Sequence, residues 1–519
     1  MRDRRAMLFL LPILCFLLVC FPVCHIVEAN PFTNIPLPEP AFVIRSDGSI
    51  DPSSAPIHRD GDIYTFTDNI VGYTIIVEKD DIILDGGGYT LKGYGSEGNF
   101  SLKGYADPTG ILIMQQNGVT VRNMKISGFS YGIKITNLFS LACTNNILEN
   151  NLVTDNYYGV YMSGSWYTVL RNNSLNNNVR NFYVYDFVSV LPPASDIYVN
   201  DIDSSNTING NPIIYWVNEQ GKTVPSDAGY VALVNCTNMT VQNLDLAHNG
   251  QGIVLVSTID SLITQNHVTD SDWGIFAHNC SSIAITENKL ESNDFGIEFH
   301  DSSNSSILSN NLARNRSGVS LVGSQNIYFL GNNITRNMGN GMWLSGLRNS
   351  TVEQNIITES DEDGVSVYDS YNNTIVGNTI TSSGYYGIKL WEGSSENIIS
   401  ENLIANNRWG LQLAGTPNNN IIYHNDFVNN TNHVETDDSN GIWDNGEEGN
   451  YWDDYAGVDN NSDGVGDTTY VIDENNQDNY PLMNQFIIPE FPTWIILPLF
   501  LIAALLVVVI RKKMFHPIT

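Results

Sequence analysis

A glycine that recurs every 22 or 23 residues constrains this chain more than any other feature of its sequence. From Gly252 to Gly410 every interval between these glycines is 22 or 23 residues, and the series is Gly252, Gly274, Gly296, Gly318, Gly341, Gly364, Gly387 and Gly410. The same pattern begins earlier at Gly110, Gly132 and Gly159, and Asn181 stands 22 residues after Gly159. A unit this short cannot bury an apolar face alone, so neighbouring units must stack. The repeat predicts a solenoid.

Each repeat glycine is followed by apolar residues at its +1 and +3 positions. The pairs are Ile253/Leu255, Ile275/Ala277, Ile297/Phe299, Val319/Leu321, Met342/Leu344, Val365/Val367, Ile388/Leu390 and Leu411/Leu413. A period of two predicts a strand whose +1 and +3 side chains face inward, while +2 and +4 face outward. Leucine-rich repeats share the period, but they need a Leu-rich consensus and usually a helix. The fold class predicted is all-β, a parallel β-helix.

An asparagine stands eight or nine residues before each glycine of the longer series. These residues are Asn243, Asn266, Asn288, Asn310, Asn333, Asn355, Asn378 and Asn402. We expect stacked coils to align their amides in a ladder that bonds the coils above and below.

The chain divides where the repeat starts, lapses and fades. We expect a signal peptide (1–29), an N-terminal cap with the first coils (30–109), coils (110–185), an excursion (186–229), coils (230–415), an Asn/Asp-rich tail (416–486), a membrane-anchor segment (487–513) and a cytoplasmic end (514–519).

Both ends of the chain indicate export. Three arginines precede an apolar run from Met7 to Val27, which reads as a secretory signal cleaved near Ala29 or as an uncleaved anchor. Near the other end, Trp494 to Ile510 carries no charge and is followed by Arg511-Lys512-Lys513. Such a run just crosses a bilayer, with its basic end in the cytoplasm. We therefore expect an extracellular body on a single-pass anchor, or on a lipid after processing.

Charge and cysteine content exclude several partners. The chain has 24 Lys and Arg against 56 Asp and Glu, a formal charge of −32, which repels nucleic acid. Three of its six cysteines lie in the first apolar run, so there is no disulfide framework. Glycosylation sequons, typical of an exported surface, occur at Asn99, Asn172, Asn235, Asn238, Asn279, Asn304, Asn315, Asn333, Asn349, Asn372, Asn429 and Asn460.

Four short segments carry a resemblance to a known family. They are residues 61–66 (GDIYTF), residues 84–91 (LDGGGYTL), residues 205–210 (SNTING) together with Tyr215-Trp216, and residues 449–455 (GNYWDDY). They resemble the NosD-like β-helix proteins of archaeal cell surfaces, and residues 489–492 resemble a PEF-type sorting signal. The resemblance implies a right-handed, pectin-lyase-like helix. The family's namesake is linked to copper delivery, and relatives are described as carbohydrate-binding or sugar-hydrolase-like.

Stacking places equal offsets from the glycine on adjacent coils. His278 and His300 both stand at +4, which predicts a copper or zinc site or simply a solvated polar surface. Candidate catalytic carboxylates of a glycosidase lie on the same coils, at Glu298, Asp301, Asp272 and Asp294. No cluster has the concentrated character of an established active site.

Aromatic residues stand at outward offsets on many coils. Those predicted to bind carbohydrate are Trp273, Phe276, Trp343, Tyr368, Trp391 and Trp409. Flat rings beside carboxylates suit sugar faces and hydroxyls, although stacking between coils that only stabilises the rod explains them equally well.

The tail contains a candidate calcium loop between Asp459 and Asp467. Asp459, Asn461, Asp463 and Asp467 supply oxygens at positions 1, 3, 5 and 9, and Gly464 stands at the turn. Position 12 is Tyr470 rather than an acid, so an Asx-rich turn is the alternative.

The sequence therefore favours a surface-anchored β-helix that binds a polysaccharide or a cell-envelope glycan along one face, with calcium as the better supported ion and copper as the weaker one. The alternatives are a polysaccharide hydrolase or lyase, a copper-binding protein, and a passive structural or adhesion rod.

Overall fold

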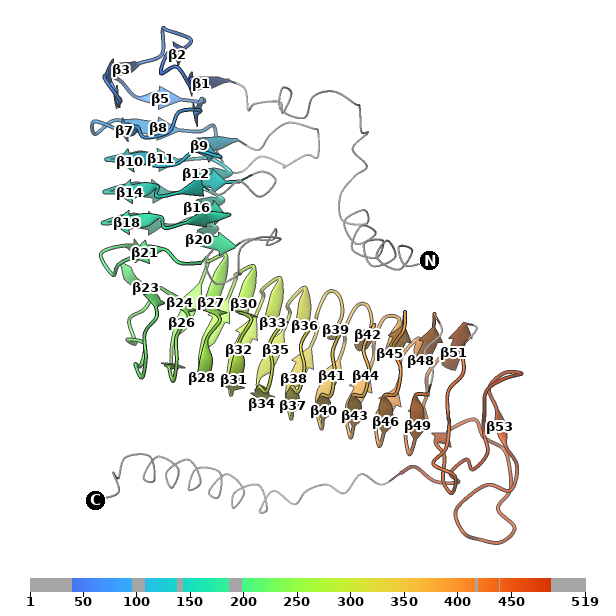
Figure 1. The fold of residues 1–519 in the computed structure, drawn as a ribbon. Coiled ribbons are helices and arrows are strands. Elements are labelled where there is room, and N and C mark those ends of the chain that lie inside the picture. Colours follow the sequence, from blue (N-terminus) through green and yellow to red (C-terminus); the bar gives the residue numbers. More distant parts are fainter. Residues whose placement is uncertain are drawn as a thin grey trace, which may run out of the picture.

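The computed structural model describes residues 40–95, 108–137, 143–185, 198–415, 419–437 and 439–486 as two β-helical rods that meet at an angle (Figure 1). We call residues 40–208 the N-rod and residues 211–437 the C-rod. Together they form about 16 turns of roughly 23 residues. Each turn contributes one short strand to each of three parallel sheets. The predicted all-β parallel β-helix is confirmed.

The sheet that contains the repeat glycines is called the glycine sheet. In the N-rod it consists of β1 (Ala41–Ile44), β6 (Thr74–Val77), β9 (Thr109–Met114), β12 (Tyr131–Thr136), β16 (Tyr158–Ser163) and β20 (Arg180–Tyr185). The second sheet consists of β4 (Ile63–Phe66), β7 (Ile83–Asp85), β10 (Thr120–Arg122), β14 (Ile147–Glu149), β18 (Val169–Arg171) and β21 (Asp201–Ile202). The third consists of β5 (Ile70–Val71), β8 (Thr90–Lys92), β11 (Lys125–Ser127), β15 (Leu152–Thr154), β19 (Ser174–Asn176) and β22 (Thr207–Ile208). Four further strands lie in the N-rod: β2 (Ile50–Asp51) and β3 (Ile57–Asp60) pair antiparallel with the first coil, and β13 (Cys143–Thr144) pairs with β17 (Ser165–Trp166).

The C-rod repeats this arrangement over more turns. Its glycine sheet consists of β23 (Asn211–Val217), β24 (Tyr230–Val234), β27 (Gln251–Val256), β30 (Trp273–His278), β33 (Phe295–His300), β36 (Ser317–Val322), β39 (Met342–Ser345), β42 (Val365–Tyr368), β45 (Tyr386–Trp391), β48 (Trp409–Ala414) and β51 (Asn432–Asp437). The second sheet consists of β25 (Thr240–Gln242), β28 (Ile259–Thr264), β31 (Ser281–Thr286), β34 (Ser306–Leu308), β37 (Tyr328–Leu330), β40 (Thr351–Glu353), β43 (Thr374–Val376), β46 (Ile398–Ser400) and β49 (Ile421–Tyr423). The third consists of β26 (Asp245–Ala247), β29 (His267–Thr269), β32 (Lys289–Glu291), β35 (Asn311–Ala313), β38 (Asn333–Thr335), β41 (Ile356–Thr358), β44 (Thr379–Thr381), β47 (Leu403–Ala405), β50 (Asp426–Val428) and β52 (Tyr451–Trp452).

The repeat glycine is required by the close stacking of coils. A Cβ atom on Gly296 would lie 2.6 Å from the carbonyl oxygen of Gly318, and one on Gly318 would lie 2.5 Å from that of Gly341. No side chain fits at such a distance. The following +1 and +3 residues fill the interior as predicted, and Ile297 and Phe299 are fully buried.

The predicted asparagine ladder is present, with a shift at two positions. Its side-chain amides bond one another at 2.9–3.0 Å through Asn266, Asn288, Asn310, Asn332, Asn355, Asn378, Asn402, Asn425 and Asn450. The prediction was wrong for Asn333, which lies beside the ladder. It was also wrong for Asn243, because the Asn266 side chain accepts the backbone N–H of Leu244 at that end of the ladder. A parallel ladder holds the sequon residue Asn315, which is fully buried and therefore closed to a glycan.

A hairpin turns the chain from the N-rod into the C-rod. The strand β22 pairs antiparallel with β23 through Asn209 and Gly210, both with positive φ, and β23 then pairs parallel with β24. This turn suits the twist of two antiparallel strands. Within the predicted excursion, β21 and β22 thus complete the last N-rod coil and β23 opens the C-rod.

The outer surface of the C-rod closes the end of the N-rod. Val254, Val256 and Phe276 point away from the C-rod interior, yet each is buried in the apolar core of the N-rod. Gly250 donates its N–H to the Phe182 carbonyl at 2.9 Å, and the Gln251 amide donates to the Val184 carbonyl at 2.9 Å. We call this junction the elbow. In Figure 1 the glycine sheets of both rods lie on the inner side of the angle.

The tail covers the other end of the C-rod. Trp443 and Trp452 are each 1% exposed and belong to the C-rod core, and β53 (Tyr470–Val471) pairs with β54 (Gln477–Asp478) beside them. No helix able to cross a membrane occurs in the described part of the chain. The predicted signal peptide, sorting motif and anchor lie outside the described residues.

Candidate functional site

The outward side of the C-rod glycine sheet gathers the predicted aromatic and histidine residues and Glu298. We call this surface the glycine face. Strand pairing aligns Trp343 with Ser366, Tyr368 with Trp391, and Tyr386 with Trp409. It also aligns Phe276 with Glu298 and His278 with His300. The face therefore runs from the elbow to the tip of the C-rod.

Three aromatic side chains form the centre of the glycine face. The ring centroids of Trp343 and Tyr368 lie 6.3 Å apart, those of Tyr368 and Trp391 lie 4.7 Å apart, and those of Trp343 and Trp391 lie 5.9 Å apart. All three rings are partly exposed. The Trp391 indole N–H donates to Ser366 Oγ at 3.3 Å, and Lys389 Nζ lies 4.8 Å from the Trp391 ring centre.

Hydrogen-bonding groups flank this centre on the side of the tip. Trp409 is partly exposed and lies 6.5 Å from Tyr386, measured between ring centroids. The Tyr386 hydroxyl donates to Glu435, and the Gln412 amide donates to the same carboxylate at 2.7 Å. Asp363 is buried beside them, and this burial raises the pKa of its carboxyl.

The two predicted aromatics nearest the elbow contact the N-rod instead. Trp273 stacks on Tyr185 at 5.1 Å, and Phe276 meets the same tyrosine edge-on at 5.5 Å. Phe276 is only 2% exposed. These rings fill the inner angle of the elbow.

The four candidate catalytic carboxylates fall into two kinds. Asp272 accepts bonds from Arg180 Nε at 2.6 Å and from the Tyr158 hydroxyl at 2.9 Å, and burial raises its pKa. Glu298 accepts bonds from the Trp273 indole and faces the His300 ring nitrogen Nε2. Asp294 and Asp301 are exposed. The buried pair is thus engaged within the elbow.

The predicted histidine pair lies on adjacent coils without converging on one point. The ring centroids of His278 and His300 are 6.3 Å apart, and His300 Nε2 is directed at Glu298. Burial lowers the pKa of His278, which favours its neutral form.

In the predicted calcium loop, the carboxylate oxygens accept hydrogen bonds from backbone N–H groups of the same loop. Asp459 accepts the N–H groups of Ser462 at 2.6 Å and of Gly464 at 3.0 Å. Asp467 accepts the N–H of Asn460 at 2.7 Å, and Asp463 accepts the N–H of Val465 at 2.9 Å. The same oxygens that would bind an ion orient the backbone of the turn.

Sequence reasoning missed the tyrosines on the outward side of the N-rod glycine sheet. Tyr131 stacks on Tyr158 at 5.2 Å, and Tyr161 stacks on Tyr183 at 4.4 Å. Tyr158 and Tyr183 reach into the elbow. The offsets −1 and +2 from Gly132, Gly159 and Asn181 would have found them by the rule used for the C-rod.

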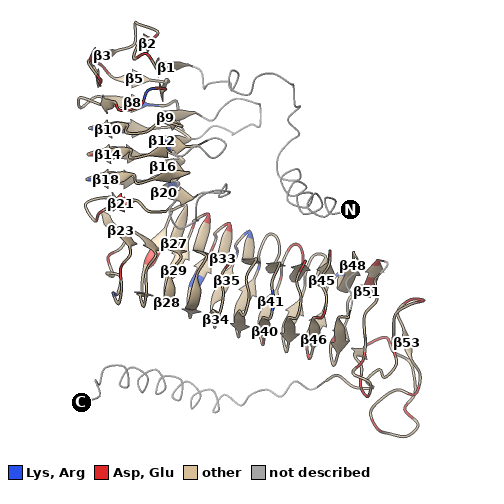
Figure 2. Ribbon diagram, in the orientation of Figure 1, with Lys and Arg blue, Asp and Glu red and all other residues tan. Residues whose placement is uncertain are grey.

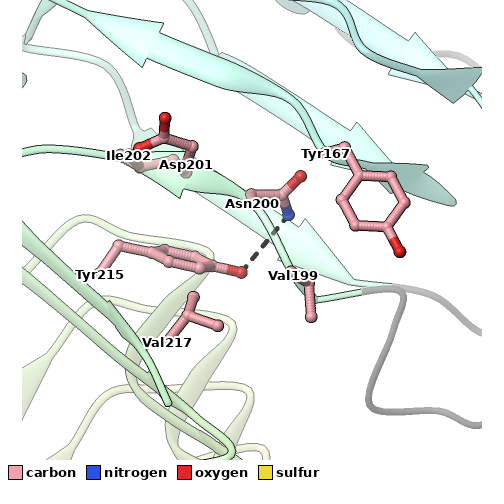
Figure 3. Close-up of a pocket in the computed structure, with 7 residues that line it drawn as sticks. All are labelled: Tyr167, Val199, Asn200, Asp201, Ile202, Tyr215 and Val217. Atoms are coloured by element: carbon pink, nitrogen blue, oxygen red, sulfur yellow. Dashed lines mark hydrogen bonds between the residues drawn. The ribbon is translucent and has the colours of Figure 1, made fainter. Parts of the chain in front are cut away.

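A shallow pocket of about 350 Å³ lies near the hairpin, between β21 and β23 (Figure 3). Its lining is mostly apolar, and the Asn200 amide donates to the Tyr215 hydroxyl at 3.4 Å. The lining residues are Tyr167, Val199, Asn200, Asp201, Ile202, Tyr215 and Val217. Figure 2 shows acidic residues spread over both rods and the tail.

The sequence of this chain matches the model of a known protein family. A family model described as "Periplasmic copper-binding protein (NosD)" matches residues 58–215, 196–337, 229–407 and 307–457, which together span most of the chain. The chain belongs to the NosD family. No curated relative matches it.

Several solved structures are similar to this NosD-family chain at low identity. The Azotobacter vinelandii mannuronan C-5 epimerase AlgE6 A-module is 14% identical, with a TM-score of 0.39, over 72% of this chain and 90% of that chain. The periplasmic alginate epimerase AlgG is 14% identical, with a TM-score of 0.34, over 73% and 80%. The bacteriophage CBA120 tailspike protein 3 is 11% identical, with a TM-score of 0.28, over 75% and 56%.

Copper, named in the NosD description, requires ligands that suit its oxidation state. Cu(I) prefers sulfur, but the described cysteines are buried apart from one another, and burial raises the pKa of Cys143 to about 11 and of Cys280 to about 12. They do not fit Cu(I). Within the described ranges, one group of histidine and carboxylate ligand atoms lies within 4.8 Å, namely His433, Asp453 and Asp454. Nitrogen and oxygen donors of this kind fit Cu(II).

Proposed function

We propose that this NosD-family protein binds uncharged carbohydrate along the glycine face of its C-rod. The observation that carries the proposal is the contiguous group of partly exposed rings formed by Trp343, Tyr368 and Trp391. Sugar faces present C–H groups that pack on aromatic rings, while their hydroxyls need hydrogen-bonding partners at the ring edges. Ser366, Gln412 and Glu435 supply such partners on the neighbouring coils.

The spacing of the coils suits an extended polymer rather than a single sugar. Consecutive coils are about 4.8 Å apart, so the rings and polar groups from β39 to β48 form a strip along the rod axis. Trp409 extends this strip toward the tip. Trp273 and Phe276, by contrast, are occupied by contacts with the N-rod. The binding set is therefore Trp343, Tyr368, Trp391 and Trp409.

Charge selects the class of glycan. The formal charge of −32 and the carboxylates of Asp363 and Glu435 on the glycine face repel polyanionic chains, although Lys389 lies among them beside the Trp391 ring. Neutral envelope polysaccharides are the preferred ligands. A polyanion would need a bridging cation to approach.

Export completes the proposal. The NosD description is that of a periplasmic family, and both ends of this sequence have the pattern of export and anchoring. We place the body outside the cell, on a single-pass helix or a lipid, with the C-terminal end in the cytoplasm. Protease treatment of intact cells should remove the body, and protection of the body would contradict this placement.

Ions enter the proposal at two positions. Calcium is proposed for the tail loop that contains Asp459 and Asp463, because its oxygens stand at calcium-loop positions. Copper is named in the family description, and the sequence candidates for it, His278 and His300, lie on adjacent coils without converging on one point.

A glycan array probed with the full-length protein tests the main proposal. We expect binding to neutral polysaccharides, weakened at least about tenfold by Trp343→Ala combined with Trp391→Ala because two stacking surfaces are lost. Tyr371→Ala is the matched control, since Tyr371 is 39% exposed and lies away from the glycine face, beside Arg348.

Other outcomes separate the alternatives. Reducing-sugar release or unsaturated products that disappear with Glu298→Gln or Asp301→Asn would establish an enzyme. Binding unaffected by loss of the two tryptophans would exclude the glycine face. No binding at all would leave the rod as a structural element of the envelope.

A further inference from the structure

The glycine series of the C-rod ends in a histidine. His433 lies one coil beyond Gly410, at the position where every preceding coil from Gly252 onward has glycine. A Cβ on Gly410 would lie 2.5 Å from the His433 carbonyl oxygen, so Gly410 cannot change. The strand β51 is the last of the described glycine sheet, so no following strand forbids a side chain at His433.

Two carboxylates from the third sheet approach this histidine. Asp453 and Asp454 directly follow β52, the last strand of that sheet. His433 Nε2 lies 2.8 Å from Asp453 Oδ1 and 3.4 Å from Asp454 Oδ1. The three ligand atoms therefore meet at the tip of the rod, although the residues are 20 and 21 positions apart in sequence.

The surroundings hold each ligand in place. The His433 side chain is 9% exposed, and its ring packs edge-on against Phe427 and Trp452. Asp453 Oδ2 accepts the N–H of Asn429 at 2.5 Å, and Asp454 Oδ2 accepts the Tyr470 hydroxyl at 3.4 Å. Each carboxylate thus has one oxygen bonded to protein and the other turned toward the histidine, which is how outer partners orient metal ligands.

The charge of the group is not balanced by basic side chains. In the described part of the chain neither Asp453 nor Asp454 forms a salt bridge with Lys or Arg. Asp453 and Asp454 therefore bring two carboxylates together at the tip without a Lys or Arg partner. A divalent cation would neutralise them.

We propose that His433, Asp453 and Asp454 bind one divalent transition-metal ion of the Zn²⁺ and Cu²⁺ class. Ligand atoms that share an ion at about 2.0–2.2 Å lie about 2.9–3.5 Å from each other. His433 Nε2 lies 2.8 Å from Asp453 Oδ1 and 3.4 Å from Asp454 Oδ1, close to that range, and all three ligand atoms lie within 4.8 Å of one another. One nitrogen with two oxygens suits these borderline ions, whereas Cu(I) selects sulfur and Ca²⁺ selects an all-oxygen shell. Three protein ligands leave positions open to water or to a ligand on the adjacent glycine face. The site is independent of glycan binding.

Isothermal titration of the full-length protein with Zn²⁺, Cu²⁺ and Ca²⁺ in separate arms tests the site. We expect one stoichiometric Zn²⁺ or Cu²⁺ per chain, with the two arms showing which ion binds more tightly, and no competition by Ca²⁺. His433→Gln, and Asp453→Asn combined with Asp454→Asn, should weaken this binding at least about 100-fold, since each removes a direct ligand. The Asn substitutions keep the acceptors for Asn429 and Tyr470.

The chain offers a matched control in a second histidine at the same end. His424 Nε2 also faces a carboxylate, Glu448, at 2.7 Å, but it has no second carboxylate in that group, so His424→Gln should leave affinity within about twofold. The electron paramagnetic resonance spectrum of Cu²⁺ bound to the unaltered protein should show coupling to one imidazole nitrogen. Absence of a stoichiometric ion, coupling to two or more nitrogens, or equal binding by the His433 and His424 variants would overturn the proposal.

Discussion

Arg180 and Asp272, which are 92 residues apart in the chain, form an ion pair of 2.6 Å. Arg180 begins β20, the last strand of the N-rod glycine sheet, and Asp272 directly precedes β30 of the C-rod. Their side chains are only 12% and 10% exposed. The pair therefore joins the two rods in the interior of the elbow, where breaking it leaves a buried charge.

Replacing Arg180 by Met should destabilise the protein by about 3–5 kcal/mol, the cost of an unpaired buried carboxylate. The urea midpoint would measure it, and hydrogen exchange should rise first in β20 and β27. Arg336→Met is the control, because its pair with Glu359 is exposed, and no measurable shift is expected. Equal shifts in the two variants would contradict a locking role for Arg180.

Asn332→Ala should destabilise the C-rod by about 2–4 kcal/mol, since it leaves several buried hydrogen-bonding groups without partners. Asn332 bonds Asn310, Asn355 and the backbone of the coil below. The neighbouring Asn333→Ala loses only one 3.4 Å contact and should change stability by less than about 0.5 kcal/mol. Thermal unfolding followed by circular dichroism compares them, and the reverse order would refute the ladder.

The stability that Asp478 contributes should fall as the pH rises from about 4 to about 6. Burial raises the pKa of this carboxyl to about 6 from its usual value of 3.8, so the folded state holds the proton more tightly than the unfolded state does. Its contribution is therefore complete below about pH 4 and lost above about pH 6. Asp478→Asn should remove this component, and urea titrations of both proteins from pH 4 to 7 would show the difference. A wild-type advantage that grows with pH would be the wrong sign.

Calcium should raise the melting temperature of the tail through the Asp459 loop. Asp459→Asn with Asp463→Asn keeps the acceptors of the turn and removes two charges, so it should lower the melting temperature in millimolar calcium but not in a chelator. The expected affinity is that of extracellular sites, about 10⁻⁴–10⁻³ M. An equal loss in both buffers would assign the loop to the turn alone.

The sequence predicted those parts of the fold that repeat. The inward direction of Ile297 and Phe299 could be predicted because every coil buries the same offsets from its glycine. The place of Asn310 in the ladder could be predicted for the same reason. Asn333 was mistaken for Asn332 because two asparagines are adjacent and only the stacked register separates them.

The elbow could not be predicted, because it depends on contacts between distant coils. Phe276 stands at an outward offset, so the repeat pattern predicts that its side chain is exposed, yet the N-rod covers it. The carbohydrate candidates Trp343, Tyr368 and Trp391 lie together because all three stand at outward offsets of the repeat. His433 was not recognised as a site residue because its partners Asp453 and Asp454 come from outside the repeat.

Each repeat glycine leaves room for the backbone of the following coil, so the place where a new coil can be inserted depends on which residue follows it in the stack. Whole coils inserted anywhere between Gly252 and Gly410 meet the same neighbours on both sides, so a gene that duplicates 22 or 23 codons lengthens the strip of aromatic rungs and leaves the tip untouched. A coil added after β51 would instead demand glycine in place of His433. The length of the rod and the chemistry of its tip can therefore evolve separately, provided that new coils are inserted before β51.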